Sequence, residues 1–86
     1  MTSPPAPQYE AIGGGHLVQK VSADGQFVTL EDGSVWEIEP SVRFQTADWQ
    51  PMAAVTVSRA HGVGPYVYEL ANTQEDEGAL ARYISR

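Results

Sequence analysis

Side chains that could do catalytic or metal chemistry are few in this sequence, and they are scattered. The imidazoles are His16 and His61, and the sequence spacing brings no cluster of metal ligands to either one, so we expect both at the surface. His61 could act as a base only beside a nucleophile and an orienting acid, and the sequence gives no reason to place them there. The chain has no cysteine, which excludes disulfides and thiolate metal sites. We therefore expect no metal and no cofactor.

Carboxylates and glycines give equally little support for an enzyme. Glu37 and Glu39 share one strand face, but a glycosidase needs a long cleft as well as two acids, and a solvated strand face explains both. The two Asp-Gly pairs lack the repeated aspartates of a calcium loop and are explained as turns. Residues 62–64 read Gly-Val-Gly, without the further glycine and helix of a dinucleotide site. We expect a protein that is not an enzyme.

The chain length and the net charge limit the kinds of partner that we expect. The chain has 86 residues, enough for one domain with a modest core, and a formal net charge of −6. That charge argues against direct binding to nucleic acids or anionic membranes, which requires clustered Lys and Arg. The cations are scattered along the chain: Lys20, Arg43, Arg59, Arg82 and Arg86.

The apolar pattern also argues against membrane insertion. No run approaches the roughly 20 apolar residues of a membrane-spanning helix. The first residues lack the basic start and continuous apolar core of a signal peptide. We expect a cytoplasmic protein.

The strongest structural signal is a hairpin over residues 27–38. Two β-rich runs flank Asp32-Gly33, which suits a two-residue type I′ turn because both central positions need positive φ. A three-residue loop would instead pair Phe27 with Glu37 and split the apolar set, so the pattern favours the tighter turn. The favoured register places on the core face Phe27, Thr29, Trp36 and Ile38.

A strand before this hairpin extends the sheet. Residues 16–22 alternate, and we assign Leu17, Gln19 and Val21 to the core face. A three-residue loop ending at Gly25 then leads into the hairpin. The result is an antiparallel meander of three strands.

Residues 39–52 interrupt the alternation. Pro40 suits the first position of a short helical turn. Phe44 and Trp49, together with Val42, are apolar enough to plug an open end of a barrel. Arg43 could pair with Asp48 or a nearby glutamate in an exposed ion pair.

Two further strands follow. Residues 53–59 alternate with Val55 and Val57 on one face, and residues 66–70 place Tyr66, Tyr68 and Leu70 on one face. Five strands with a meander and a closing hairpin indicate a small antiparallel barrel, SH3-like or OB-like in outline. This is an analogy of shape, and it implies no function.

The two ends of the chain differ from the barrel segment, residues 16–71. Residues 1–15 are rich in Pro and end in three glycines, which predicts a flexible arm that either stays extended, docks on a partner or folds back on the barrel. Residues 72–86 form an acidic tail or a short helix, since Thr73 to Asp76 fits a capping box. Gly78 weakens that helix by about 1 kcal/mol.

These features favour a noncatalytic module that binds another protein, or a second copy of itself, as a structural subunit of a larger assembly. The alternative is a small acidic inhibitor that occupies a basic protein surface and mimics nucleic acid, using Glu31, Asp32, Glu37, Glu39 and the acidic run 75–77. A third possibility is a small ligand-binding barrel or enzyme. Because aromatic and aliphatic side chains dominate protein interfaces, the candidate partner-binding residues are Tyr9, Ile12, Trp49, Tyr66, Tyr68, Leu80, Tyr83 and Ile84.

Overall fold

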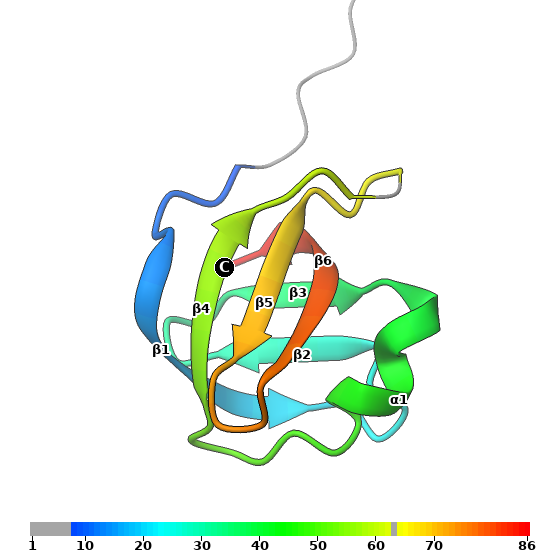
Figure 1. Cartoon of the computed structure of the whole chain (residues 1–86). Coiled ribbons are helices and arrows are strands. Elements are labelled where there is room, and N and C mark those ends of the chain that lie inside the picture. The colour runs from blue at the N-terminus through cyan, green and yellow to red at the C-terminus, as the bar shows by residue number, and fades with distance from the viewer. Residues whose placement is uncertain (1–7, 63) are drawn as a thin grey trace, which may run out of the picture.

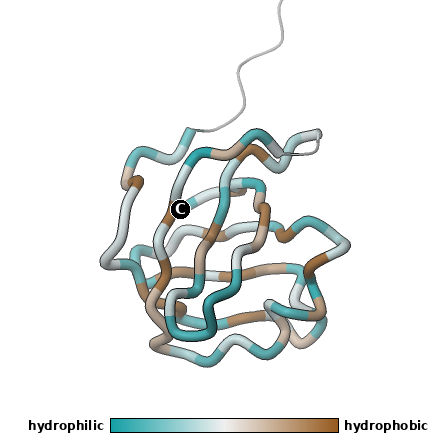
Figure 2. Tube along the Cα trace, in the orientation of Figure 1, coloured by the Kyte–Doolittle hydropathy of each residue, from teal (hydrophilic) through white to brown (hydrophobic). Residues whose placement is uncertain are grey.

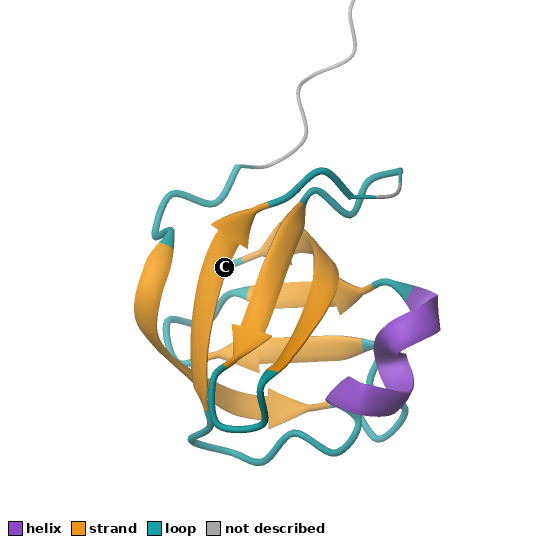
Figure 3. Cartoon of the chain, in the orientation of Figure 1, coloured by secondary structure: helices purple, strands orange, loops and turns teal. Residues whose placement is uncertain are grey.

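Six antiparallel strands close into a barrel in the order β1-β2-β3-β6-β5-β4 (Figure 1). The computed structural model describes residues 8–62 and 64–86, so residues 1–7 of the expected arm lie outside the described part. Apart from one short helical segment, strands and their connecting loops make up the described chain (Figure 3). The strands are β1 Gly13–Val21, β2 Phe27–Leu30, β3 Val35–Ile38, β4 Ala54–Arg59, β5 Tyr68–Asn72 and β6 Glu77–Ser85.

The predicted small antiparallel barrel is confirmed, with six strands in place of five. Among the residues described, no helix is both long and apolar enough to cross a membrane. In the view of Figure 1, β4, β5 and β6 lie side by side in front of β2 and β3.

The short helix expected within residues 72–86 is wrong, because Glu77–Ser85 forms β6. β6 pairs with both β3 and β5, so it occupies the gap that would otherwise leave two unpaired strand edges. The supposed capping box is the β5–β6 turn, where the Oδ1 atom of Asn72 accepts hydrogen bonds from the backbone N–H groups of Gln74 and Glu75. Strand pairing on both sides of residues 77–85 therefore outweighs the local sequence signals for a helix.

The hairpin register is also wrong by one residue. Phe27 pairs with Glu37 and Val28 pairs with Trp36, as a three-residue loop requires. The backbone N–H of Gly33 donates to the carbonyl oxygen of Leu30, and Gly33 has φ of 84°. Phe27 is therefore 39% exposed, whereas Leu30 on the opposite face is fully buried.

The core face of β1 is the opposite of the predicted one. His16 and Val18 are buried, while Gln19 is exposed. Val21 nevertheless packs against the core, because a register shift between Val18 and Lys20 changes the alternation. β1 pairs with β2 and β4, so both neighbours constrain which face points inward.

The connector after β3 holds a 3₁₀ turn, η1 Pro40–Val42, and a short helix, α1 Arg43–Thr46. Pro40 opens the turn as predicted. Trp49 is buried, as expected of a plug, but Phe44 is 72% exposed and does not plug the barrel. Arg43 pairs with Glu37, the predicted glutamate alternative to Asp48, at 3.6 Å.

Close packing fixes α1 against the turn between β1 and β2. Gly25 has φ of 76°, and a Cβ atom there would lie 2.0 Å from the carbonyl oxygen of Arg43. The hydroxyl of Thr46 donates to the carbonyl oxygen of Gly25 at 2.7 Å. Only glycine fits this contact.

The hairpin of β4 and β5 agrees with the sequence pattern. Val57 pairs with Leu70 and Arg59 with Tyr68, and the predicted faces of both strands are confirmed. β5 begins at Tyr68, so Tyr66 lies in the preceding loop and is partly buried.

Trp36 lies at the centre of the core. Its ring centroid is 4.8 Å from that of Tyr9, 5.3 Å from that of Tyr68 and 5.2 Å from that of Tyr83.

Hydrophobic positions recur along the strands in Figure 2, while the β5–β6 turn is hydrophilic. The largest fully buried apolar side chains are Trp36, Tyr9, Leu30, Ile38, Leu70, Val18, Val28, Val55 and Val57.

The observed register places the first and last residues of β2, Phe27 and Leu30, on opposite faces of the strand. We expect Leu30→Ala to lower the free energy of unfolding by about 2 to 5 kcal/mol, because it leaves a cavity in the core. Phe27→Ala removes a larger but partly exposed side chain, and we expect a loss of about 1 kcal/mol or less. Urea denaturation of both variants measures the difference. A larger loss for Phe27→Ala would support the two-residue turn instead.

Candidate functional site

One end of the barrel is covered by residues 8–12, which we call the strap. Tyr9 is 1% exposed and lies against Trp36 and Tyr83, with ring centroids 4.8 Å and 5.2 Å away. Its backbone N–H donates to the hydroxyl of Tyr68 at 3.0 Å. Of the placements considered for the arm, the strap therefore folds back on its own barrel.

A polar cluster surrounds the hydroxyl of Tyr9. This hydroxyl donates to the Oδ2 atom of Asp32, which also accepts from Nη2 of Arg86 at 3.1 Å. The Oδ1 atom of Asp32 accepts from the hydroxyl of Ser34 at 2.6 Å and from its backbone N–H at 3.0 Å. Ser34 in turn accepts a hydrogen bond from the indole N–H of Trp36, at 2.9 Å. The cluster thus joins the β2–β3 turn to the strap and to the C-terminal residue.

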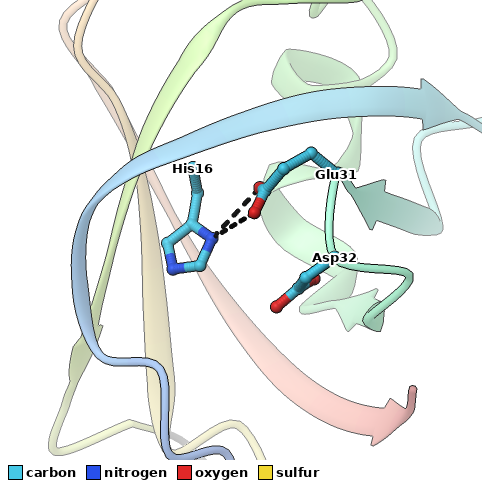
Figure 4. Close-up of side chains that lie close together, drawn as sticks. All are labelled: His16, Glu31 and Asp32. Atoms are coloured by element: carbon cyan, nitrogen blue, oxygen red, sulfur yellow. Dashed lines mark hydrogen bonds and ion pairs between the residues drawn. The ribbon is translucent and has the colours of Figure 1, made fainter.

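His16 lies beside this cluster and is 8% exposed, although the sequence predicted a surface position. Its Nε2 atom is 2.7 Å from the carbonyl oxygen of Ala11 in the strap, and its Nδ1 atom is 3.1 Å from each carboxylate oxygen of Glu31 (Figure 4). Glu31 also accepts from the backbone N–H of Leu17 at 2.9 Å. The ligand atoms of His16, Glu31 and Asp32 all lie within 4.8 Å of one another.

Contacts within the cluster shift the pKa values of Asp32, Tyr9 and Arg86, that of Arg86 upward through its hydrogen bond to Asp32. Burial acts to raise the pKa of Asp32, but hydrogen bonds from Ser34, Tyr9 and Arg86 outweigh it and hold that pKa well below its ordinary value. Burial and the hydrogen bond to Asp32 raise the pKa of Tyr9. Asp32 is therefore the acceptor and Tyr9 the donor in their contact.

Sequence reasoning did not find this cluster. His16 and Glu31 are 15 positions apart and meet because β1 pairs with β2, with the β1 face inverted relative to the prediction. The sequence indicates Asp32 as a turn residue and as one of the acids of the inhibitor alternative, with no contact to His16. The available signal was that His16 and Val18 alternate, so that a buried Val18 would bring His16 to the same face.

The predicted partner-binding residues do not form one surface. Tyr9, Trp49 and Tyr68 are core residues, and Trp49 donates its indole N–H to Glu77 at 3.0 Å. Ile12 is 42% exposed. The partly buried candidates are Tyr66, Leu80, Tyr83 and Ile84.

The two strand carboxylates considered for acid–base chemistry are engaged separately. Glu37 accepts two hydrogen bonds from Arg82, at 2.7 and 3.0 Å, and this contact lowers the pKa of Glu37. Glu39 accepts from the hydroxyl and backbone N–H of Ser41 at the start of η1. Each carboxylate has a local structural role.

Comparisons of this chain with protein-family models, with curated proteins and with solved structures found no match. The cluster must therefore be interpreted from its own geometry. That geometry holds the strap to the barrel through Tyr9 and His16.

The lowered pKa of Asp32 predicts a dependence of stability on pH. The ionised carboxylate stabilises the fold fully above about pH 4, the usual pKa of an unfolded aspartate, and this contribution is lost as pH falls toward the lower folded-state pKa. We expect Asp32→Asn to lower the free energy of unfolding at pH 7 by about 2 kcal/mol. The variant should also lose less stability than the wild type between about pH 4 and pH 2.

Urea denaturation over this pH range tests the prediction. Asp48→Asn changes an exposed carboxylate and serves as the matched control, with little effect expected on stability. An unchanged pH dependence in Asp32→Asn would contradict the role assigned to Asp32.

Proposed function

We propose that the protein is a noncatalytic module that binds another protein as a structural subunit of a larger assembly, with the barrel as a rigid body. Buried apolar side chains from all six strands lie in the barrel interior. At the covered end, the carboxylate of Asp32 accepts hydrogen bonds from Tyr9, Ser34 and Arg86. Function in such a module depends on its outer surface.

The observation that carries this proposal is the conformation of Met52. This residue has φ of 72° while its side chain is 69% exposed. A bulky residue in the left-handed region costs about 1 to 2 kcal/mol, and such strain tends to occur at functional positions. Phe44, on the same connector between β3 and β4, is even more exposed. The proposed contact surface is this connector, and its partner is a protein with a complementary apolar surface.

The position of β6 in the closed barrel rules out a test by deletion of the C-terminal residues. Deletion of residues 72–86 would remove β6 and open the barrel, so point substitutions are required. Met52→Gly removes the exposed side chain in a conformation that glycine adopts freely, and we expect it to change stability by about 1 kcal/mol or less. Phe44→Ser changes a side chain that is already mostly in water.

We expect the double variant Phe44→Ser with Met52→Gly to weaken partner binding about 30-fold or more, the loss of a typical interface hot spot. The partner is first identified by photo-crosslinking from positions 44 and 52 in the native cell, and binding is then measured with purified proteins. Val67→Ser is the matched control, since Val67 is 47% exposed in a different loop. Equal binding by the double variant and the control would contradict the assigned surface.

Sedimentation of the purified chain distinguishes a separate partner from a second copy. A concentration-dependent dimer that the double variant lacks would make this chain its own partner. We also propose that the barrel is SH3-like or OB-like in outline and that the protein is cytoplasmic.

The acidic-inhibitor alternative has one specific observation in its favour. Glu75 and Asp76 are exposed at the β5–β6 turn and lie next to Glu77. The other four acids that the sequence suggested for this role are engaged within the chain. Glu31 contacts His16, and Asp32 contacts Arg86. Glu37 contacts Arg82, and Glu39 accepts from Ser41. The acidic turn is therefore the surface that this function would use.

This alternative predicts a strong dependence on charge. If it holds, Glu75→Gln with Asp76→Asn should weaken partner binding about tenfold, and wild-type binding should fall steeply as salt rises. Affinity measured at two salt concentrations for the wild type, this variant and the connector variant tells the two functions apart. Glu77 is left unchanged because it accepts the hydrogen bond of Trp49.

A further inference from the structure

The buried ring of His16 has one nitrogen whose contacts fix its protonation. Nε2 lies 2.7 Å from the carbonyl oxygen of Ala11, which can only accept a hydrogen bond. Nε2 must therefore carry the hydrogen. In the neutral ring, Nδ1 then presents a lone pair.

That lone pair points at another acceptor. Both carboxylate oxygens of Glu31 lie 3.1 Å from Nδ1, and an ionised carboxylate has no hydrogen to donate (Figure 4). Two acceptors at this distance repel unless a cation lies between them. The cation is either a proton on Nδ1 or a metal ion.

The surroundings of Nδ1 match those of a metal ligand. A metal-bound histidine usually donates its other ring N–H to a carbonyl or carboxylate oxygen, as His16 does to Ala11. Asp32 supplies a third ligand atom within 4.8 Å of the other two. One imidazole and two carboxylates suit Zn²⁺, with water completing the coordination.

The distances between the three ligand atoms are close to those that Zn²⁺ requires. Tetrahedral coordination with bonds of about 2.0 to 2.2 Å places ligand atoms about 3.4 Å apart. His16 and Glu31 are already near this separation at 3.1 Å. The ligand atom of Asp32 lies within 4.8 Å of the other two and would need to approach them by about 1 Å.

We propose that Nδ1 of His16 and the carboxylates of Glu31 and Asp32 form a binding site for a divalent cation of the Zn²⁺ type. The site goes beyond the proposed interaction function. Because His16 also binds Ala11, the ion fixes the strap against the barrel end.

Arg86 competes with the ion for Oδ2 of Asp32, an atom that also accepts from the hydroxyl of Tyr9. Its guanidinium donates to Oδ2 of Asp32 at 3.1 Å, but the side chain is 56% exposed and can move into water. A bound dication repels this guanidinium. Arg86→Gln should therefore tighten metal binding about threefold or more.

The test is calorimetric titration of the full metal-free chain with Zn²⁺, followed by titration with Co²⁺ monitored by visible absorption. We expect one ion per chain, with affinity reduced at least tenfold in both His16→Gln and Glu31→Gln. His61→Gln is the matched control, because His61 is exposed and lies outside the cluster. Glu75→Gln with Asp76→Asn controls for weak binding to surface carboxylates.

Nuclear magnetic resonance of the His16 ring in the wild-type chain keeps the test independent of how the variants fold. Zn²⁺ should shift the Nδ1 resonance of His16 and leave that of His61 unchanged. Protons on both ring nitrogens of His16, with no change on adding Zn²⁺, would show that a proton fills the role and overturn the metal site. Equal loss of Zn²⁺ binding in the acidic-turn control and in His16→Gln would also overturn it.

Discussion

Closure of the sheet by β6 is the constraint on which the other features depend. β6 pairs with β3 on one side and β5 on the other, and this pairing turns two sheet edges into a continuous barrel. Closure fixes which faces point inward, and it brings Trp36 into contact with Tyr68 and Tyr83. A domain of 86 residues has a small core, and Trp36 heads its largest fully buried side chains.

The strap adds both apolar and polar contacts to the closed barrel. Tyr9 adds a further ring to the aromatic cluster, while its hydroxyl and the ring of His16 meet carboxylates of the β2–β3 turn. Burying an ionised carboxylate such as that of Asp32 is unfavourable unless it is hydrogen-bonded, and its donors come from the strap, the β2–β3 turn and Arg86. The same arrangement brings together His16, Glu31 and Asp32, the proposed ligands of a cation.

Two exposed segments of the described chain differ in their chemistry. The connector carries exposed Phe44 and a strained Met52, while the β5–β6 turn carries carboxylates. An apolar contact would depend little on salt and a charged one strongly. The proposed function and its alternative therefore differ in a measurable physical property as well as in the residues involved.

The sequence alone determined the small antiparallel barrel, the turn at Pro40, the faces of β4 and β5, and the net negative charge, because these follow from local alternation, turn residues and composition. Only the tertiary structure decided the register of the hairpin, the inward face of β1 and the strand character of residues 77–85. A one-residue slip exchanges the two faces of a strand at little local cost, so partners on both sides must select between them. The cluster of His16, Glu31 and Asp32 could not be predicted, since its members meet only once that selection has been made.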